Sequence, residues 1–167
     1  SKLILALDLS DSKEVLRIVD KLSTLIQIFK IGSTLFTASG PSILDEIRKR
    51  GADVFLDLKY HDIPNTVADA IRQAVKHDVK MLTLHTLGGI EMMKQGVEVV
   101  QKTAGSRPPL LLGVTVLTSF EQNSMQETLQ TPLSVTEMVL HLAQTASDAG
   151  LDGVVASPWE VALLRKN

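Results

Sequence analysis

The chain has 167 residues, a formal net charge of −2 and a pI near 6.1. This balance provides no strongly basic surface, so neither nucleic acid nor an anionic membrane is expected as a partner. The absence of cysteine excludes disulfides and thiolate metal sites. No apolar run is long enough for a signal peptide or a membrane span, and we expect a soluble, cytoplasmic protein.

Short apolar runs alternate with amphipathic stretches along the whole chain. The runs predict strands over residues 3–9, 26–32, 53–58, 79–85, 110–118 and 152–157. Helical spacing of apolar residues predicts a helix after each of the first five, the last of them over 135–149 beyond a polar loop. Expected helix starts include Ser10 or Asp11 as an N-cap, Pro41 in a first turn, and Asn65 as an N-cap.

The strands recur at a nearly constant period. The first four begin near residues 3, 27, 53 and 79, with spacings of 24, 26 and 26 residues. Such a period is typical of βα units, and near-continuously apolar strands indicate a parallel sheet covered by helices. Two architectures fit this pattern: an open, doubly wound sheet and a (β/α)8 barrel. The sequence predicts a single α/β domain over 1–167 in either case.

Polar residues at the strand ends favour the barrel. They follow successive units rather than one switch point: Asp8, Lys30, Asp57 with Lys59, His85, and Thr118 with Ser119. A barrel gathers such residues at its C-terminal mouth, whereas an open sheet usually carries a Gly-rich loop after its first strand. The stretch LSDSKE has no glycine. Because a complete barrel needs roughly 250 residues, we expect about the first six βα units of a longer domain.

The third strand ends in an unusual charged cluster. Asp57 and Lys59 are two apart and share a strand face, and Asp62 lies in the following turn. A surface ion pair worth about 0–1 kcal/mol would be the ordinary interpretation. Asp8 and Lys30 at equivalent strand ends favour a shared site instead. A lysine among carboxylates keeps its ammonium form, which suits a proton donor better than a nucleophile.

Several segments resemble the orotidine 5′-phosphate decarboxylase family. They are ALDLS at 6–10, FKIG at 29–32, DLKYHDIPNTV at 57–67, LTSF at 117–120 and GLDGVVAS at 150–157. The resemblance runs through all 167 residues, and the Asp-Ile-Pro-Asn-Thr continuation is its specific element. It implies decarboxylation of orotidine 5′-phosphate to UMP, a step of pyrimidine biosynthesis, without metal or organic cofactor.

The same resemblance implies a role for each matching residue. Lys59 would deliver a proton to C6 of the pyrimidine, with Asp57 beside the departing carboxylate. Asp62 would complete the charged array of a second subunit in a homodimer with shared active sites. Asp8 and Lys30 would serve as ribose-binding and network positions, and Lys30 and Asp62 count with Asp57 and Lys59 as catalytic. The remaining substrate contacts would be Ile63, Pro64, Asn65, Thr66 and Thr118.

Other interpretations remain open at this point. The family's phosphate contacts, which follow strands seven and eight, are absent from this sequence, so we expect the chain alone to be nearly inactive. A metal-dependent sugar-phosphate decarboxylase or aldolase of the same superfamily would place a metal-binding glutamate where Lys30 stands. A truncated barrel serving only as a binding or assembly module is the third possibility. The spacing of His61, His77, His85 and His141 matches no metal motif, and His61 and His85 are expected as supporting groups at the mouth.

Overall fold

A computed structural model describes residues 3–166. The strands are β1 (Ile4–Ala6), β2 (Ile28–Gly32), β3 (Asp53–Tyr60), β4 (Met81–His85), β5 (Leu110–Val114) and β6 (Gly153–Val155). The helices are α1 (Ser12–Leu22), α2 (Ser33–Ser39), α3 (Ser42–Arg48), α4 (Pro64–Lys76), α5 (Ile90–Thr103), α6 (Gln122–Leu129), α7 (Val135–Asp148) and α8 (Val161–Lys166), with a 3₁₀ turn η1 (Thr86–Gly88).

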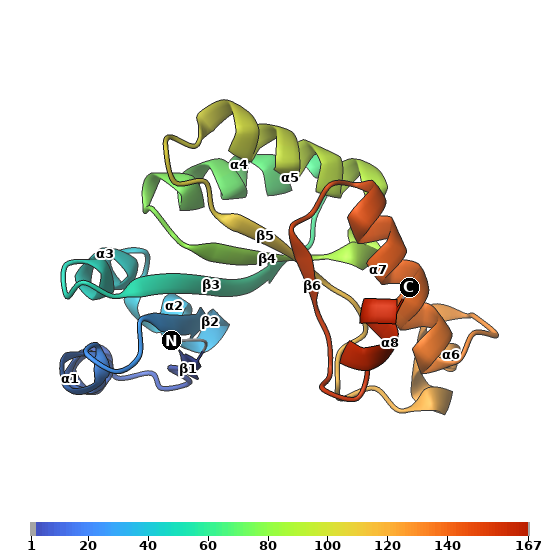
Figure 1. The fold of residues 1–167 in the computed structure, drawn as a ribbon, viewed down its shortest axis with the longest axis horizontal. Helices are drawn as coiled ribbons and strands as arrows, with labels where there is room; N and C mark the ends of the chain where they lie inside the picture. The colour runs from blue at the N-terminus through green and yellow to red at the C-terminus, as the bar shows by residue number, and fades with distance from the viewer. Residues whose placement is uncertain (1–2, 167) are drawn as a thin grey trace.

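The strands form one sheet in the order β1-β2-β3-β4-β5-β6, with every neighbouring pair parallel. A doubly wound sheet would reverse its strand order at a switch point, and this sheet does not. The strands curl into an arch, with the helices along its outer side (Figure 1). The predicted barrel-type α/β fold is thus confirmed, as six successive βα units.

The core fills the space between the sheet and the helices. Phe29 and Ile31 of β2 and Leu56 of β3 are almost completely buried and belong to one apolar cluster with residues of α1 to α5. Alternation along the strands turns Lys30 and Asp57 to the opposite, concave face. Burial of each large apolar side chain contributes about 1.5–3 kcal/mol. The convex face therefore carries the main apolar core, while the concave face carries apolar residues such as Phe55 and Met81 together with the polar groups of the strand ends.

Helix starts show where local sequence signals succeed and where they fail. Asp11 caps α1 by accepting hydrogen bonds from the backbone N–H of Lys13 and Glu14. The expected cap at Asn65 is wrong, because Pro64 begins α4 and Ile63 takes the cap position. Pro is favoured at a helix start since it has no N–H to leave unpaired. Pro41 likewise lies just outside α3 rather than in its first turn.

Two helices and several strand ends differ from the sequence prediction. Helix α2 begins directly after β2, and α6 forms within the stretch expected to be a polar loop. The strands predicted over 3–9, 110–118 and 152–157 end earlier or shrink to three residues in β1 and β6. The apolar residues beyond these strands still pack, but they leave the ladder to form the mouth loops.

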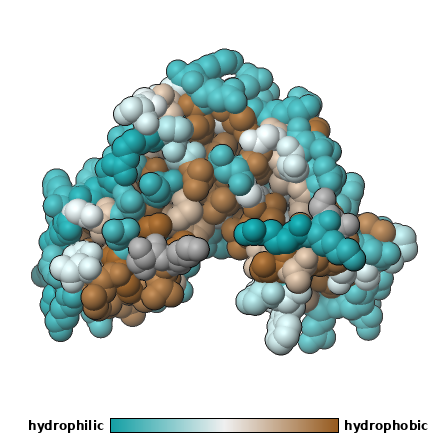
Figure 2. Space-filling model, viewed as in Figure 1, coloured by the Kyte–Doolittle hydropathy of each residue, from teal (hydrophilic) through white to brown (hydrophobic). Residues whose placement is uncertain are grey.

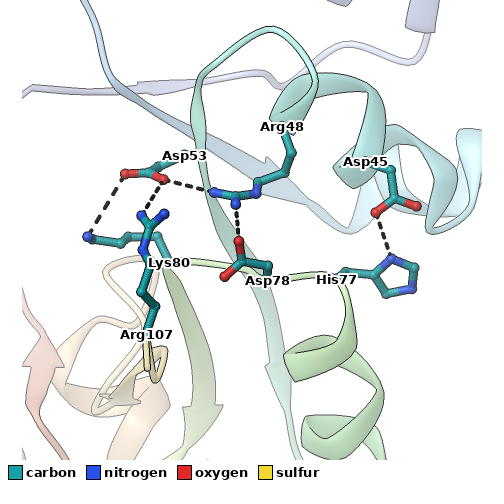
Figure 3. A network of polar contacts seen from close by, with 7 residues as sticks. All are labelled: Asp45, Arg48, Asp53, His77, Asp78, Lys80 and Arg107. Atoms are coloured by element: carbon teal, nitrogen blue, oxygen red, sulfur yellow. Dashed lines mark hydrogen bonds and ion pairs between the residues drawn. The ribbon is translucent and has the colours of Figure 1, made fainter. Parts of the chain in front are cut away.

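An ion network joins the starts of three strands at the opposite end of the sheet from the mouth (Figure 3). The carboxylate of Asp53 lies 3.0 Å from Arg48 Nη1, 3.3 Å from Arg107 Nη2 and 3.9 Å from Lys80 Nζ. Arg48 also pairs with Asp78. These contacts tie α3, β3 and the segments leading into β4 and β5 together, so the network stabilises the N-terminal end of the barrel.

The arch has a hollow side between its two ends (Figure 2). Within residues 3–166, β1 pairs only with β2, and β6 only with β5. These outer strands carry exposed apolar side chains, such as Ile4 and Val155. No helix in the described part of the chain is both long and apolar enough to cross a membrane.

Candidate active site

Four of the predicted charged side chains meet at the C-terminal ends of the first three strands. Asp8 follows β1, Lys30 lies in β2, and Asp57 and Lys59 lie near the end of β3. The parallel register pairs Ala6 with Lys30 and Gly32 with Asp57, which brings these strand ends level. The neighbouring side chains then converge on the concave side of the sheet.

Asp57 is the centre of this cluster. Its Oδ2 lies 3.0 Å from Lys59 Nζ and 3.6 Å from Lys30 Nζ, and its Oδ1 accepts a hydrogen bond of 2.9 Å from the Thr83 hydroxyl. Its side chain is only 12% exposed. A carboxylate this buried needs charged partners, and the two ammonium groups provide them.

Lys30 connects Asp57 to the rim. Its Nζ lies 3.2 Å from Asp8 Oδ1, so the charges alternate in the order Asp8, Lys30, Asp57, Lys59. Exposure rises outward, from 12% at Asp57 and 23% at Lys30 to 70% at Asp8. The array is neutral as a whole, but each end presents one charge to a ligand: a carboxylate at Asp8 and an ammonium at Lys59.

The backbone at Lys59 is the least regular part of β3. Its φ of 51° lies in the left-handed region, and the pairing of β3 with β4 shifts register between Leu56 and Tyr60. Such a conformation costs of order 1–3 kcal/mol in a residue with a side chain. The Lys59 N–H donates to the Thr83 hydroxyl at 2.9 Å, which holds the kink. Alternation predicted that Asp57 and Lys59 would lie together, and they do, although the strand is irregular at Lys59.

Thr83 is a site residue that sequence reasoning missed. It lies in β4, is completely buried, and binds both the side chain of Asp57 and the backbone of Lys59. An isolated threonine in an apolar strand gives little indication of such a role. The only signal in the sequence was its expected position on the same face of the sheet as the charged residues of the neighbouring strands.

The polar groups of the turn after β3 make no ion pair with the array among residues 3–166. Asp62 is exposed, and its Oδ1 accepts a hydrogen bond of 2.6 Å from the Ile63 N–H. Among residues 3–166 it makes no ion pair, so the approach of Asp62 to Lys59 within one chain is not observed. Pro64, Asn65 and Thr66 form the first turn of α4, and the Ile63 side chain is 67% exposed.

Thr118 lies apart from the charged cluster, in the loop after β5. It lines a hollow of about 400 Å³ with Leu117, Phe120 and the almost fully exposed Trp159. This hollow lies between the loops that follow β5 and β6, whereas the charged cluster lies on β1 to β3. None of the four charged residues of the cluster lines this hollow.

Two of the four histidines lie at the mouth, as expected. His85 ends β4 and His61 directly follows β3, with 5.3 Å between their ring centroids. Burial, followed by the charges of His61 and Lys59, lowers the pKa of His85 below its ordinary value. His77 instead pairs with Asp45 on the outer helices, and His141 is exposed on α7. Within the described residues, no three histidine or acidic side chains are grouped to hold a metal ion.

Comparisons with known proteins agree along the whole chain. Residues 1–167 match the "Orotidine 5'-phosphate decarboxylase / HUMPS family". A relative from Geotalea daltonii is 48% identical over 167 residues, and one from Dictyoglomus turgidum is 45% identical over 168. Both are named orotidine 5′-phosphate decarboxylase. The matches cover 99% of this chain and 70% and 69% of the relatives.

Solved structures show the same fold. Orotidine 5′-phosphate decarboxylase from Lactobacillus acidophilus superposes with a TM-score of 0.90 at 35% identity, covering 99% of this chain and 75% of that one. An uncharacterised conserved protein from Geobacillus kaustophilus gives a TM-score of 0.93 at 35% identity, covering 98% and 77%. The sequence and the fold therefore agree, and the chain belongs to the orotidine 5′-phosphate decarboxylase / HUMPS family.

Proposed function

We propose that this protein decarboxylates orotidine 5′-phosphate to UMP and carbon dioxide. Family membership and the names of its relatives support a decarboxylase. The observation that carries the proposal is the Lys59 ammonium, 3.0 Å from a buried carboxylate that is itself bound by Lys30 and Thr83. Such a cation is held in place before any substrate arrives.

The chemistry requires a fixed positive charge. When the bond between C6 and the carboxylate breaks, its electron pair stays on C6 in an orbital that the ring cannot delocalise. Lys59 stabilises this charge and donates a proton to C6, which gives UMP and a neutral amine that solvent reprotonates. Only an interaction that strengthens as the charge develops lowers the barrier, and a preorganised ammonium meets this requirement.

The neighbouring groups keep that ammonium in position. Asp57 binds Lys59 and Lys30 together, and we assign it the place beside the departing carboxylate. Asp8 is the most exposed member of the array, which suits a ribose hydroxyl contact, and Lys30 joins the two acids. We assign Thr118 to the pyrimidine, with the hollow beside it as support.

A homodimer would complete the site. Asp62 is exposed and unpaired by any cation among residues 3–166, and the adjacent Ile63 is also exposed. We propose that Asp62, with Ile63 to Thr66, enters the active site of a second copy and faces its Lys59. A second carboxylate there would hold the ammonium from the side opposite Asp57. The cytoplasmic location inferred from the sequence stays a prediction.

The proposed reaction uses no metal or organic cofactor. The metal-dependent alternative needs a carboxylate where Lys30 stands, and here an ammonium lies 3.2 Å from Asp8 and 3.6 Å from Asp57. That cation would repel a divalent ion between the same carboxylates. Turnover that survives a strong chelator supports the cofactor-free reaction, while loss of turnover that a divalent metal restores would favour the metal-dependent one.

Phosphate binding is expected from two further βα units of a closed barrel. Binding energy from a remote phosphate assists chemistry at the reacting carbon, so we expect residues 1–167 alone to turn over poorly. Calorimetry with UMP together with a decarboxylation assay, on this chain and on a form extended by the two further βα units (the eight-stranded form), separates an enzyme from a binding module. A module would bind UMP in both forms and decarboxylate in neither.

The decisive variant is Lys59→Ala in the eight-stranded form. We expect turnover to fall by at least about 10³-fold while UMP still binds, because Lys59 acts on a charge that UMP lacks. Lys94→Ala, on the exposed side of α5, is the matched control. Near-normal turnover of Lys59→Ala would refute the proposal.

A further inference from the structure

Two imidazole rings pack together beside the charged array. His85 lies two residues after Thr83 in β4, so strand alternation turns both to the concave face. The His61 ring lies with its centroid 5.3 Å from that of His85, and the two planes are tilted by 32°. The decarboxylation proposed above uses neither ring.

His61 also packs against the next turn of the mouth. A Cβ atom added to Gly88 would lie 3.3 Å from His61 Cδ2 and would collide with Met92 Sδ. The backbone of η1 at Gly88 therefore lies close to the His61 ring, and a larger residue there would require Met92 and His61 to move. In sequence, His61 stands between Lys59 and Asp62. Fixing its ring against His85 and Gly88 therefore constrains the backbone on both sides.

The surroundings of His85 suit a neutral ring. Its Nδ1 is buried without a hydrogen-bond partner among residues 3–166. Lys59 from β3 and His61 from the following turn both oppose a positive charge on it, in addition to burial. An unprotonated nitrogen is the less costly form when no acceptor is available.

We propose that His61 and His85 form a packed ring pair that fixes the turn between Lys59 and Asp62, and that both are positioning residues for the decarboxylation. The inference rests on the proposed function, because it assigns the pair a role in holding Lys59 and Asp62. The pair acts through these two residues and touches no reacting atom.

Protonation should separate the rings. A charge on His85 would face the His61 ring and the Lys59 ammonium, with Asp57 already bound by two lysines. The folded-state pKa of His85 is lowered, so its neutral form persists below the ordinary value of 6.5. The positioning effect is therefore complete near neutral pH and is lost as the pH falls through that lowered value.

The kinetic test compares ring-removing and ring-retaining variants in the eight-stranded form. His85→Ala should lower kcat by about 10- to 100-fold with a smaller change in KM, since misplacement of about 1 Å can cost that much. His85→Phe should restore most of the lost kcat, because it retains a ring and leaves no buried nitrogen. His141→Ala on the exposed face of α7 is the control. Unchanged kcat in His85→Ala, or equal losses in the Ala and Phe variants, would overturn the proposal.

The pH profile provides a second kinetic readout. The double variant His61→Phe/His85→Phe keeps two neighbouring rings but removes the imidazole of His85, whose protonation is proposed to separate them. It should lose less of its kcat than the parent enzyme between pH 7 and pH 5. Identical acid limbs in the two proteins would contradict the proposed separation of charged rings.

Proton NMR of the imidazole rings tests the pair without any activity. The His85 resonance, assigned by its loss in His85→Phe, should show a neutral ring at pH 6.5 and should shift in His61→Ala. An active enzyme whose His85 titrates normally and ignores His61→Ala would overturn the inference. Coupled rings in a protein that cannot decarboxylate would instead overturn the proposed function, and with it the positioning role, leaving only a structural contact.

Discussion

Replacing Thr83 with valine removes one hydroxyl from the centre of the site while keeping the shape of the side chain. That hydroxyl donates to Asp57 Oδ1 at 2.9 Å and accepts the Lys59 N–H at 2.9 Å. Thr83 is completely buried, so water does not replace either bond. The variant therefore leaves one backbone N–H and one carboxylate oxygen without their partner.

The size of the effect follows from these two bonds. An unsatisfied buried N–H costs about 1–3 kcal/mol, and a hydrogen bond to a charged group contributes about 1.5–3 kcal/mol. Asp57 keeps both lysines, which offsets part of the second loss, so we expect about 2–4 kcal/mol lower stability. For a domain of this size, that corresponds to a fall in Tm of roughly 4–16 °C. The left-handed backbone at Lys59 also loses its restraint, so kcat should fall more than KM rises.

Urea and thermal unfolding of Thr83→Val, with Thr83→Ser as the matched variant, measure the effect. Serine keeps the hydroxyl and loses one methyl, worth about 1 kcal/mol. We expect serine to retain most of the stability and most of the kcat. Equal stability and equal kcat for valine and serine would refute the argument, because the two hydrogen bonds would then contribute nothing.

Three further variants test other parts of the structure. Lys59→Gly should be more stable than Lys59→Ala by about 1–2 kcal/mol in urea unfolding, since only glycine adopts a φ of 51° without strain, and both should lack turnover. Asp53→Asn removes the carboxylate that lies between three cations, so it should lower the free energy of unfolding by about 1–3 kcal/mol. It should leave kcat unchanged, because the network lies far from the mouth. The control Asp69→Asn, in a short-range pair on α4, should change neither quantity. Ser134→Ala should cost about 1 kcal/mol by removing the capping box of α7. The Ser134 hydrogen bond lowers the pKa of Glu137. The stability that Glu137 contributes through this bond is therefore present above pH 4.5 and is lost as the pH falls through the lowered folded-state pKa. If the stabilities of the parent and of Ser134→Ala depended on pH in the same way, this assignment would be contradicted.

The strands of this fold could be predicted because short apolar runs recur along the sequence at a regular spacing. Parallel strands with a covered convex face need continuous apolar runs, and the regular spacing of these runs indicates βα units. Helices α2 and α6 were missed for the opposite reason. Helix α2 has no capping side chain, and in α6 only Met125 is buried. Short helices of this kind form because tertiary packing holds them, not because their sequences favour them.

The charged part of the site was predictable to the same extent. Asp57 and Lys59 could be paired by alternation, and Asp8 and Lys30 by their equivalent positions at strand ends. Thr83 could not, because its two hydrogen bonds depend on the register of β3 against β4. The left-handed backbone of Lys59 has no local signal either, since neither glycine nor asparagine occupies the position.

The convex and concave faces of the sheet have different roles, and this explains how a small fold can hold a site that reduces its stability. The convex face buries Phe29, Ile31 and Leu56 against the helices and provides the free energy of folding. The concave face can then hold a buried carboxylate, two lysines and a strained backbone, each of which reduces stability on its own. Strain at Lys59 persists only while Thr83 and Asp57 restrain it on two sides. A lysine that relaxed would still be a cation, but it would no longer lie at one fixed point, and a fixed position is what stabilisation of a developing charge requires.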